Sequence, residues 1–409
     1  MQPVVTTSTA LAELGAYLES LEAVGLDTEF LRERTYRAEL CLVQVSATRD
    51  ASCVDPLALT DLGLLARPLT APGIIKIMHA SRQDLEVLLP VTGLVRPVFD
   101  TQIAAALAGL PAQVGYAELV RRLIGHELPK THTRTDWSRR PLSPEQIEYA
   151  LDDVRYLLPL KSLLEEQLDK LGRVQWLTEE LAALDDARSF TTEPDQAWQR
   201  VKGLRGLDDQ RQRLAQQLAA WRERRAIERN RPRGWILDDT ALREIVLRVP
   251  RSTQELSSIA EMPAGVVKHC GDELLACVRE ADIEDPPPAL PGRTRPDPLK
   301  TALVKKLGAL NQAIAADLGL SPEILATSSV DSSNPNRSKF SATRAGVTDL
   351  GMTTLPSWMC QRSTTWAAVR SWVLAISTTA GSSSTAPCAI GDQASVAMPS
   401  SVSTLRSVT

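Results

Sequence analysis

Cysteine is scarce in this sequence, and its spacing excludes the common small metal-binding and redox motifs. The 409 residues include six cysteines, and no two of them form a C-x-x-C pair. Zinc ribbons and thioredoxin-like centres depend on such close pairs. We therefore expect free thiols, as in a cytoplasmic protein, and no disulfide framework.

Long apolar runs and a surplus of positive charge are also missing. We find no stretch of about 18 apolar residues to span a bilayer, and no basic start with an apolar run that would predict a signal peptide. The net charge is −4, so a nucleic-acid partner would have to be recognised by local basic patches. The length is sufficient for two or three globular domains.

What the sequence does contain is a pair of acids at the end of an expected strand. The apolar residues of 24–26 lead into Asp27 and Glu29. Side chains two positions apart on a strand share a face, so these carboxylates should lie side by side. Adjacent anions raise each other's pKa unless a cation separates them, and oxygen ligands favour Mg²⁺ or Mn²⁺. A solvated strand end would explain this stretch alone equally well.

Further acids follow in the next segments. Asp84 falls in the first turn of a helix that begins after the apolar run 73–79. Its alternative role there is purely structural, a favourable interaction of the carboxylate with the helix dipole. In a later helix, Tyr149 and Asp153 are spaced i, i+4 and share a face. Asp152 is turned about 100° away from Asp153, so we leave it out of the site. Two divalent ions could neutralise four carboxylates and activate water for phosphodiester hydrolysis.

The order and spacing of these residues resemble the bacterial ribonuclease D family, within the DEDD superfamily of 3′→5′ exonucleases. The resemblance covers about residues 1–205 and rests on five motifs: Leu26-Asp-Thr-Glu-Phe, His79-Ala-x-x-x-Asp84, Phe99-Asp-Thr-Gln, Asp136-Trp-Ser-x-Arg-Pro-Leu and Gln146-x-x-Tyr149-Ala-x-x-Asp153-Val. It implies that two divalent ions (Mg²⁺ or Mn²⁺, with Co²⁺ also used in the family) bind Asp27, Glu29, Asp84 and Asp153. Tyr149 would define the Tyr subtype, because the His subtype needs histidine where Glu148 stands.

The resemblance also implies a substrate, the single-stranded 3′ end of RNA, typically of a tRNA precursor. Phe30 and Leu31 would lie near the terminal bases, where stacking tolerates any sequence. The basic loop 130–143 would hold phosphates, or else be a solvated linker. The residues expected at the substrate in this first domain are Phe30, Leu31, His79, Trp137 and Arg140.

From Leu204 the sequence is helical and contains the densest basic and aromatic cluster of the chain. Trp221 and Trp235 lie among Arg222, Arg224, Arg225, Arg229, Arg231 and Arg233. The segment resembles the helicase-and-ribonuclease-D C-terminal domain (HRDC), and Arg229, Arg231 and Arg233 are expected to contact RNA. An exposed helix end with packed tryptophans is the alternative.

Residues beyond this segment change character twice. A proline-rich stretch near 286 predicts a stiff linker, and the amphipathic pattern after Pro298 predicts a helix that starts a second HRDC-like unit. From about Thr327 the sequence is rich in Ser and Thr and has no helical period. We favour a frameshift in the gene over a natural low-complexity tail, and translation of the other reading frames would decide between them.

We therefore expect an α/β ribonuclease-H-like exonuclease domain, a mixed sheet flanked by helices, followed by all-α HRDC-like domains. The expected boundaries are 1–205 for the exonuclease domain, 206–284 for HRDC, 285–326 for the linker and second unit, and 327–409 for the tail. The expected function is that of a cytoplasmic, monomeric, metal-dependent 3′→5′ exoribonuclease that releases nucleoside 5′-monophosphates from RNA. The rivals are a proofreading-type DNA exonuclease and a non-catalytic nucleic-acid-binding adaptor. The HRDC-like segment and the missing polymerase domain favour the RNA enzyme over the first, and the intact acids argue against the second.

Overall fold

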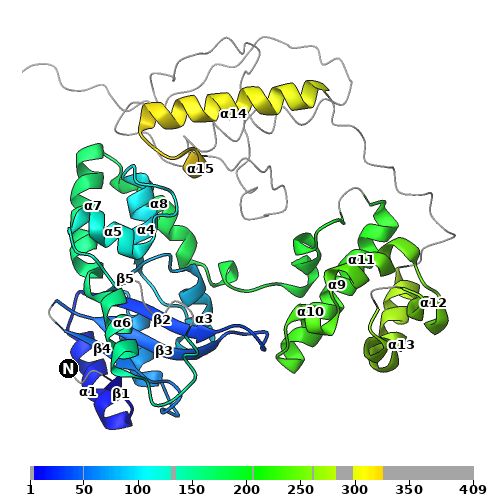
Figure 1. The fold of residues 1–409 in the computed structure, drawn as a ribbon, viewed down its shortest axis with the longest axis horizontal. Coiled ribbons are helices and arrows are strands. Elements are labelled where there is room, and N and C mark those ends of the chain that lie inside the picture. Colours follow the sequence, from blue (N-terminus) through cyan, green and yellow to red (C-terminus); the bar gives the residue numbers. More distant parts are fainter. Residues whose placement is uncertain are drawn as a thin grey trace, which may run out of the picture.

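The computed structural model describes residues 4–48, 50–129, 135–204, 207–259, 262–281 and 298–325. Both the proline-rich linker and the segment interpreted as frameshifted lie outside these residues. Figure 1 shows a sheet-containing domain and a separate group of helices, with one further long helix. Within the described residues, no helix is both long and apolar enough to cross a membrane.

The first domain is built on a six-stranded mixed sheet, as the sequence predicts. Strands β2, β3 and β4 form an antiparallel meander, and β5 and β6 continue the sheet parallel to β2. A short β1 pairs parallel to β4 at the other edge. In sheet order the strands are β1 (Val4–Val5), β4 (Ala51–Val54), β3 (Glu39–Ser46), β2 (Ala23–Leu31), β5 (Ile75–Met78) and β6 (Val98–Asp100).

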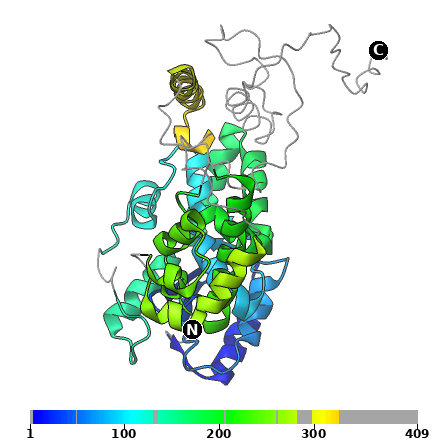
Figure 2. The ribbon, with the colours of Figure 1, turned by 90° about the vertical axis from the view of Figure 1, so that its right-hand side faces the viewer.

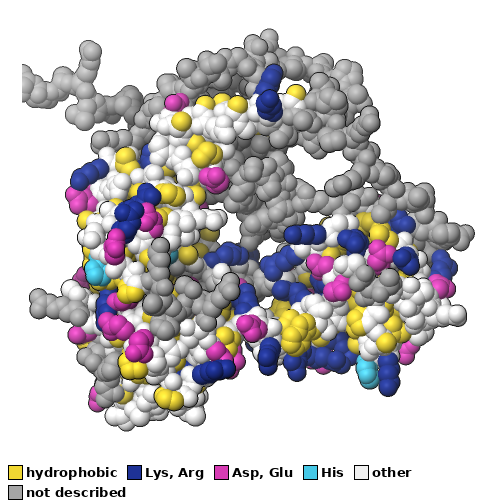
Figure 3. All heavy atoms as spheres, viewed as in Figure 1, with side chains coloured by type: hydrophobic (Ala, Val, Ile, Leu, Met, Phe, Trp, Pro, Cys, Tyr) yellow, Lys and Arg dark blue, Asp and Glu magenta, His cyan; other side chains and the backbone are white. Residues whose placement is uncertain are grey.

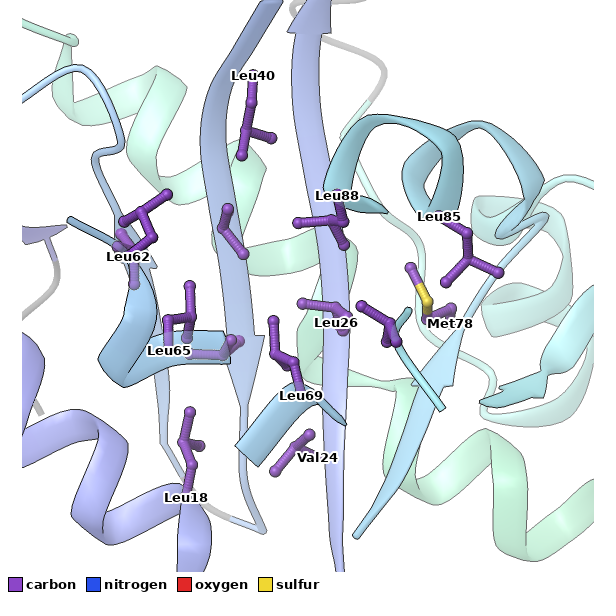
Figure 4. Packing of buried hydrophobic residues seen from close by; sticks show 14 of the residues in the cluster. Leu18, Val24, Leu26, Leu40, Leu62, Leu65, Leu69, Met78, Leu85 and Leu88 are labelled. Carbon is purple, nitrogen blue, oxygen red and sulfur yellow. The ribbon is translucent and has the colours of Figure 1, made fainter. Parts of the chain in front are cut away.

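Helices cover both faces of this sheet and divide its core into two layers. One layer holds α1 (Ser8–Glu19), α2 (Gly63–Thr70) and α3 (Arg82–Thr92). Figure 4 shows leucines of these helices, among them Leu18, Leu65 and Leu88, meeting Val24 and Leu26 of β2. The helices of the opposite layer are α4 (Thr101–Leu107), α5 (Tyr116–Leu123), α6 (Pro144–Arg155), α7 (Leu157–Leu171) and α8 (Val174–Leu181).

A close approach between strand β2 and the C-terminal part of α6 depends on Gly25. The Ser46 hydroxyl donates a hydrogen bond to the Val154 carbonyl (2.7 Å), which joins β3 to α6 beside this glycine. A Cβ atom at position 25 would lie 2.2 Å from the Ser46 Oγ and 3.2 Å from the Val154 carbonyl oxygen. Glycine therefore allows α6 to lie directly on the strand that carries Asp27 and Glu29.

The second domain consists of helices packed around its own core. Leu214, Leu218, Leu242, Ile245 and Leu274 are fully buried in it. Asp208, Asp238 and Ser252 cap three of the helices through side-chain oxygens. These helices are α9 (Asp209–Arg229), α10 (Arg233–Ile236), α11 (Asp239–Arg248), α12 (Thr253–Ser257) and α13 (Ala264–Glu280).

The last described helices pack on the exonuclease domain. In α14 (Pro298–Leu318) and α15 (Pro322–Leu325), Ile314 and Leu325 are buried in the same cluster as residues of α4, α7 and α8. The Arg173 guanidinium, before α8, donates to the carbonyls of Leu107 (2.7 Å) and Leu318. Figures 1 and 2 both place α15 between α14 and the rest of this domain. The helix expected to start a second HRDC-like unit is thus anchored on the first domain.

Candidate active site

Asp27 and Glu29 point to the face of the sheet that α6 covers. Gly25 contacts Val154 of α6, and side chains two and four residues further along a strand share its face. Asp27 lies opposite Gln44 of β3, and the register shifts between Glu29 and Phe30. The two acids therefore share one face, as expected, but they lie within β2 (Ala23–Leu31) rather than at the end of a strand, just before its irregular step.

Asp84 is brought to this pair by the first turn of α3. Thr28 stands between the two acids in the sequence, and its side chain is buried. Its hydroxyl donates a hydrogen bond to the Asp84 Oδ1 at 2.5 Å. Asp100 holds the turn before α3, because its carboxylate accepts hydrogen bonds from the Ser81 amide and hydroxyl, both at 2.8 Å. Asp100 also caps α4, because its carboxylate accepts hydrogen bonds from the Gln102 and Ile103 amides. Sequence reasoning missed Thr28, although a hydroxyl between two acids was a visible signal.

Tyr149 and Asp153 come from α6. This helix begins with a capping box in which Ser143 and Gln146 satisfy each other's backbone amides. The Tyr149 hydroxyl donates to the Asp153 carboxylate, and the Tyr149 ring lies 6.2 Å from that of the buried Trp137. Asp152 pairs instead with Arg155 at 2.5 Å, so its carboxylate already has a cationic partner and we leave it out of the candidate site.

The four carboxylates have raised pKa values. Burial, followed by repulsion from Asp84, Asp153 and Glu29, raises the pKa of Asp27 well above its ordinary value. Burial, followed by repulsion from Asp153 and Asp84, raises the pKa of Glu29 to about 8. Burial raises the pKa of Asp153 to about 7 and that of Asp84 to about 6. The structure has thus gathered negative charge that protons or cations must neutralise.

Two observations bear on a metal at this site. The Gln44 amide, opposite Asp27, is fully buried, and neither of its polar atoms has a hydrogen-bond partner among the described residues. Uncompensated acids with a spare amide beside them fit a hydrated divalent cation. However, no three Asp, Glu, His or Cys side chains in the described part of the chain are arranged as a ready metal-binding set. The described residues thus supply the negative charge that would bind metal ions, but they do not form a preorganised coordination shell.

An open cavity of about 450 Å³ gives access to the α6 side of the site. Its lining includes Tyr149 and Asp153, the pair already joined by a hydrogen bond. The cavity is lined by Leu128, Pro129, Pro144, Glu145, Glu148, Tyr149, Asp152 and Asp153. A substrate phosphate could therefore approach the acids from this side.

The substrate contacts expected in the first domain already have partners within the protein. The His79 ring nitrogens lie 2.9 Å from the Thr101 Oγ1 and 3.0 Å from the Val114 carbonyl oxygen. The Arg140 guanidinium holds Asp55 at 2.8 Å and also donates to a backbone carbonyl of β3. Phe30 and Leu31 are partly buried. Contact with RNA stays a prediction for all of these residues and for Trp137.

The arginines of the helical domain divide into paired and unpaired ones. Figure 3 shows many Lys and Arg side chains on this domain, several of them beside Asp or Glu. Arg222 is buried and pairs with Asp239 at 2.7 Å, and Arg225 pairs with Glu273 at 3.1 Å. By contrast, Arg229 and Arg231 are exposed, and neither forms a salt bridge with another described residue.

Arg233 takes part in a contact between the two domains. Its guanidinium donates to the fully buried Glu223 at 2.7 Å and lies 4.9 Å from the Tyr36 ring centroid. The Tyr36 hydroxyl donates to the same carboxylate, and the Asn230 side chain accepts from the amide of Tyr36 at 3.1 Å. Tyr36 belongs to the loop between β2 and β3, which reaches toward α10 in Figure 1. The expected RNA-binding role of Arg233 therefore competes with a structural one.

Comparison with known proteins agrees with this architecture. Residues 2–169 match the family of 3′-5′ exonuclease domains, and residues 211–278 match the HRDC domain. The chain is 40% identical over 342 residues to Ribonuclease D of Jannaschia sp. (strain CCS1), which covers 80% of this chain and 87% of that protein. The chain belongs to the ribonuclease D family.

Other relatives extend the similarity. Ribonuclease D of Granulibacter bethesdensis is 38% identical over 335 residues, covering 79% of this chain and 84% of that protein. The crystal structure of Escherichia coli RNase D, described as an exoribonuclease involved in structured RNA processing, superposes with a TM-score of 0.71 at 33% identity. That match covers 80% of this chain and 87% of the other. The expected fold, a ribonuclease D exonuclease domain followed by an HRDC domain, is confirmed.

Proposed function

We propose that this ribonuclease D family member is a 3′→5′ exoribonuclease that depends on two divalent ions and releases nucleoside 5′-monophosphates from single-stranded 3′ ends, including those of tRNA precursors. One observation carries the proposal. Asp27, Glu29, Asp84 and Asp153 converge from three separate elements, with the Tyr149 hydroxyl bonded to Asp153. When bound, Mg²⁺ or Mn²⁺ would neutralise these acids and acidify the attacking water.

The other side chains of the site would position the water molecule and the acids. Burial and the surrounding acids raise the pKa of Tyr149 above its ordinary value, so its hydroxyl stays protonated at neutral pH. Its one proton is donated to Asp153, so the hydroxyl oxygen can orient a water molecule by accepting a hydrogen bond from it, but it does not remove a proton. Thr28 fixes one oxygen of Asp84. The four acids would hold the ions, and Tyr149 would position the nucleophile.

Digestion of matched RNA and DNA oligonucleotides tests this function. With Mg²⁺ present, RNA with a free 3′ end should lose single nucleotides, whereas RNA with a blocked 3′ end should remain intact. The DNA strand should be cut more slowly. Equal or faster cutting of DNA would support a proofreading-type DNA exonuclease. No cutting of either strand would support a non-catalytic nucleic-acid-binding adaptor.

The role of Tyr149 has a matched control in Tyr156, which follows α6 and stacks on His126 at 5.0 Å between ring centroids. Tyr149→Phe removes only the hydroxyl, so turnover should fall about 10²–10⁴-fold with little change in RNA binding. Tyr156→Phe should retain nearly normal turnover. Equal rates for the two variants would remove Tyr149 from the reaction.

A further inference from the structure

Trp235 is exposed to an unusual degree. It is 59% exposed, more than any other large hydrophobic residue in the described part of the chain. The Arg231 guanidinium lies over its ring, 5.8 Å from the centroid. Indole rings usually bury their apolar surface or mark a binding site, so this exposure calls for a partner.

Trp221, on α9 of the same domain, shows what a structural version of this pair looks like. Its ring is half-buried, with Arg225 5.9 Å from the centroid. The Trp221 Nε1 donates to Glu273 at 2.6 Å, and Arg225 pairs with the same acid. The indole N–H and one end of the guanidinium thus both bind Glu273 within the protein. By contrast, Trp235 stays 59% exposed with only the Arg231 guanidinium over its ring, and no described acid forms a salt bridge with Arg231.

The chemistry of the exposed pair fits single-stranded RNA. An aromatic face stacks with any base, and stacking contributes about 1–3 kcal/mol per base. An unpaired guanidinium beside the ring can contact a phosphate, and Arg229 adds a second exposed cation two residues earlier. An acidic protein partner would use only the charge, and an apolar partner would use only the ring. A nucleotide uses both, because it carries a base and a phosphate.

The position of this pair relative to the acids also fits a nucleic-acid strand. Arg233, two residues before Trp235, is held against Tyr36 in the loop after β2. Tyr36 lies seven positions after Glu29 in the chain, so their Cα atoms are at most about 25 Å apart. A short single strand whose 3′ end lies at the acids could therefore reach Trp235.

We propose that Trp235, with the Arg231 guanidinium over one side of its ring and Arg229 close in sequence, is a base-stacking site for single-stranded RNA upstream of the 3′ end. This assignment rests on the proposed exoribonuclease function. It separates the arginines of the predicted cluster by role. Arg222, Arg225 and Arg233 maintain the domain and its contact with the loop after β2, and Arg229 and Arg231 contact RNA.

Binding of a 3′-blocked RNA of about ten nucleotides to the full chain, without divalent metal, tests the assignment. Trp235→Leu should weaken binding roughly tenfold, the lower part of the range for one stacked base. Trp235→Phe, which keeps an aromatic face, should retain most of the affinity. Both variants should melt like the unaltered protein, because the side chain lies at the surface.

A charge control sharpens the test. Arg231→Ala should lower the slope of log K against log salt by about 0.7, the value for one phosphate contact on a single strand. Arg248→Ala also removes one surface arginine, but Arg248 is paired with Glu244 at 3.0 Å and should leave the slope unchanged. Equal slopes for the two variants, or full affinity in Trp235→Leu, would overturn the stacking site.

The outcome is separable from that of the proposed function. Hydrolysis of a dinucleotide, which is too short to reach Trp235, should be the same in all these variants. A chain that binds the longer RNA through Trp235 but cuts no RNA would refute the exoribonuclease and leave the stacking site. A chain that cuts RNA but binds equally well with Trp235→Leu would refute the stacking site alone.

Discussion

In the exonuclease domain four acids lie close together. Burial and neighbouring acids raise their pKa values, and no described Lys or Arg is among the main groups that act on them. In the HRDC domain the buried arginines Arg211 and Arg222 each face an aspartate, and the buried Glu223 faces Arg233. Buried charge normally requires a partner. These charges of the HRDC domain are balanced within the domain, whereas the four acids have no such partner and would be neutralised by ions. At the four acids, unbalanced burial therefore marks a site for chemistry, and the balanced pairs of the HRDC domain mark structure.

The largest effect should follow from removing one of the unbalanced charges. Asp27→Asn, Glu29→Gln, Asp84→Asn or Asp153→Asn should each lower the hydrolysis rate at least about 10³-fold, because each removes charge that the ions need. In metal-free buffer the same variants should melt at an equal or higher temperature, since repulsion is relieved. Rate assays and thermal melts measure the two effects. Near-normal activity in any variant at saturating Mg²⁺ would exclude that residue from the site.

A smaller loss is expected from the hydroxyl that orients one of the acids. Thr28→Val keeps the shape of the side chain but removes the donor to Asp84, and such supporting partners commonly contribute 10–100-fold in metal affinity or activity. Mn²⁺ binding, followed by calorimetry, should weaken together with turnover. Thr28→Ser should restore both, and a Val variant with unaltered Mn²⁺ affinity would reduce Thr28 to a packing residue.

The raised pKa values of the acids predict that the stability of the folded chain depends on pH. Glu29, Asp153 and Asp84 have folded-state pKa values of about 8, 7 and 6, above those of an unfolded chain. Between about pH 4 and pH 8 the folded state therefore binds more protons, so stability must fall as pH rises. Thermal melts in chelator should show this fall, and Mg²⁺ should reverse it near pH 8. A melting temperature that stays constant or rises over this window in chelator would contradict the burial of these charges.

The sequence predicted most of the fold and the acids, and the reasons are local. Strand alternation places Asp27 and Glu29 on one face, and helical spacing joins Tyr149 to Asp153. The roles of the arginines could not be predicted this way. Arg231 and Arg233 are two residues apart and look alike in the sequence, yet Arg233 meets Glu223 and Tyr36 through tertiary contacts. Neutralising the whole cluster at once would therefore confound RNA binding with stability.

The smallest effect on catalysis should come from breaking a balanced pair. Glu223→Gln removes a fully buried carboxylate from the Arg233 guanidinium, which is itself 39% exposed, so the free energy of unfolding should fall by about 1–3 kcal/mol. Arg224→Ala removes an exposed pair with Asp195 at 3.5 Å and should cost less than about 1 kcal/mol. Denaturant unfolding of the full chain compares the two. Hydrolysis of a dinucleotide should change little in either variant, because neither residue touches the acids. If Glu223→Gln abolished that hydrolysis while the chain stayed folded, the contact between Tyr36 and Glu223 would have to act on the catalytic strand itself, and the division between balanced and unbalanced charge would fail.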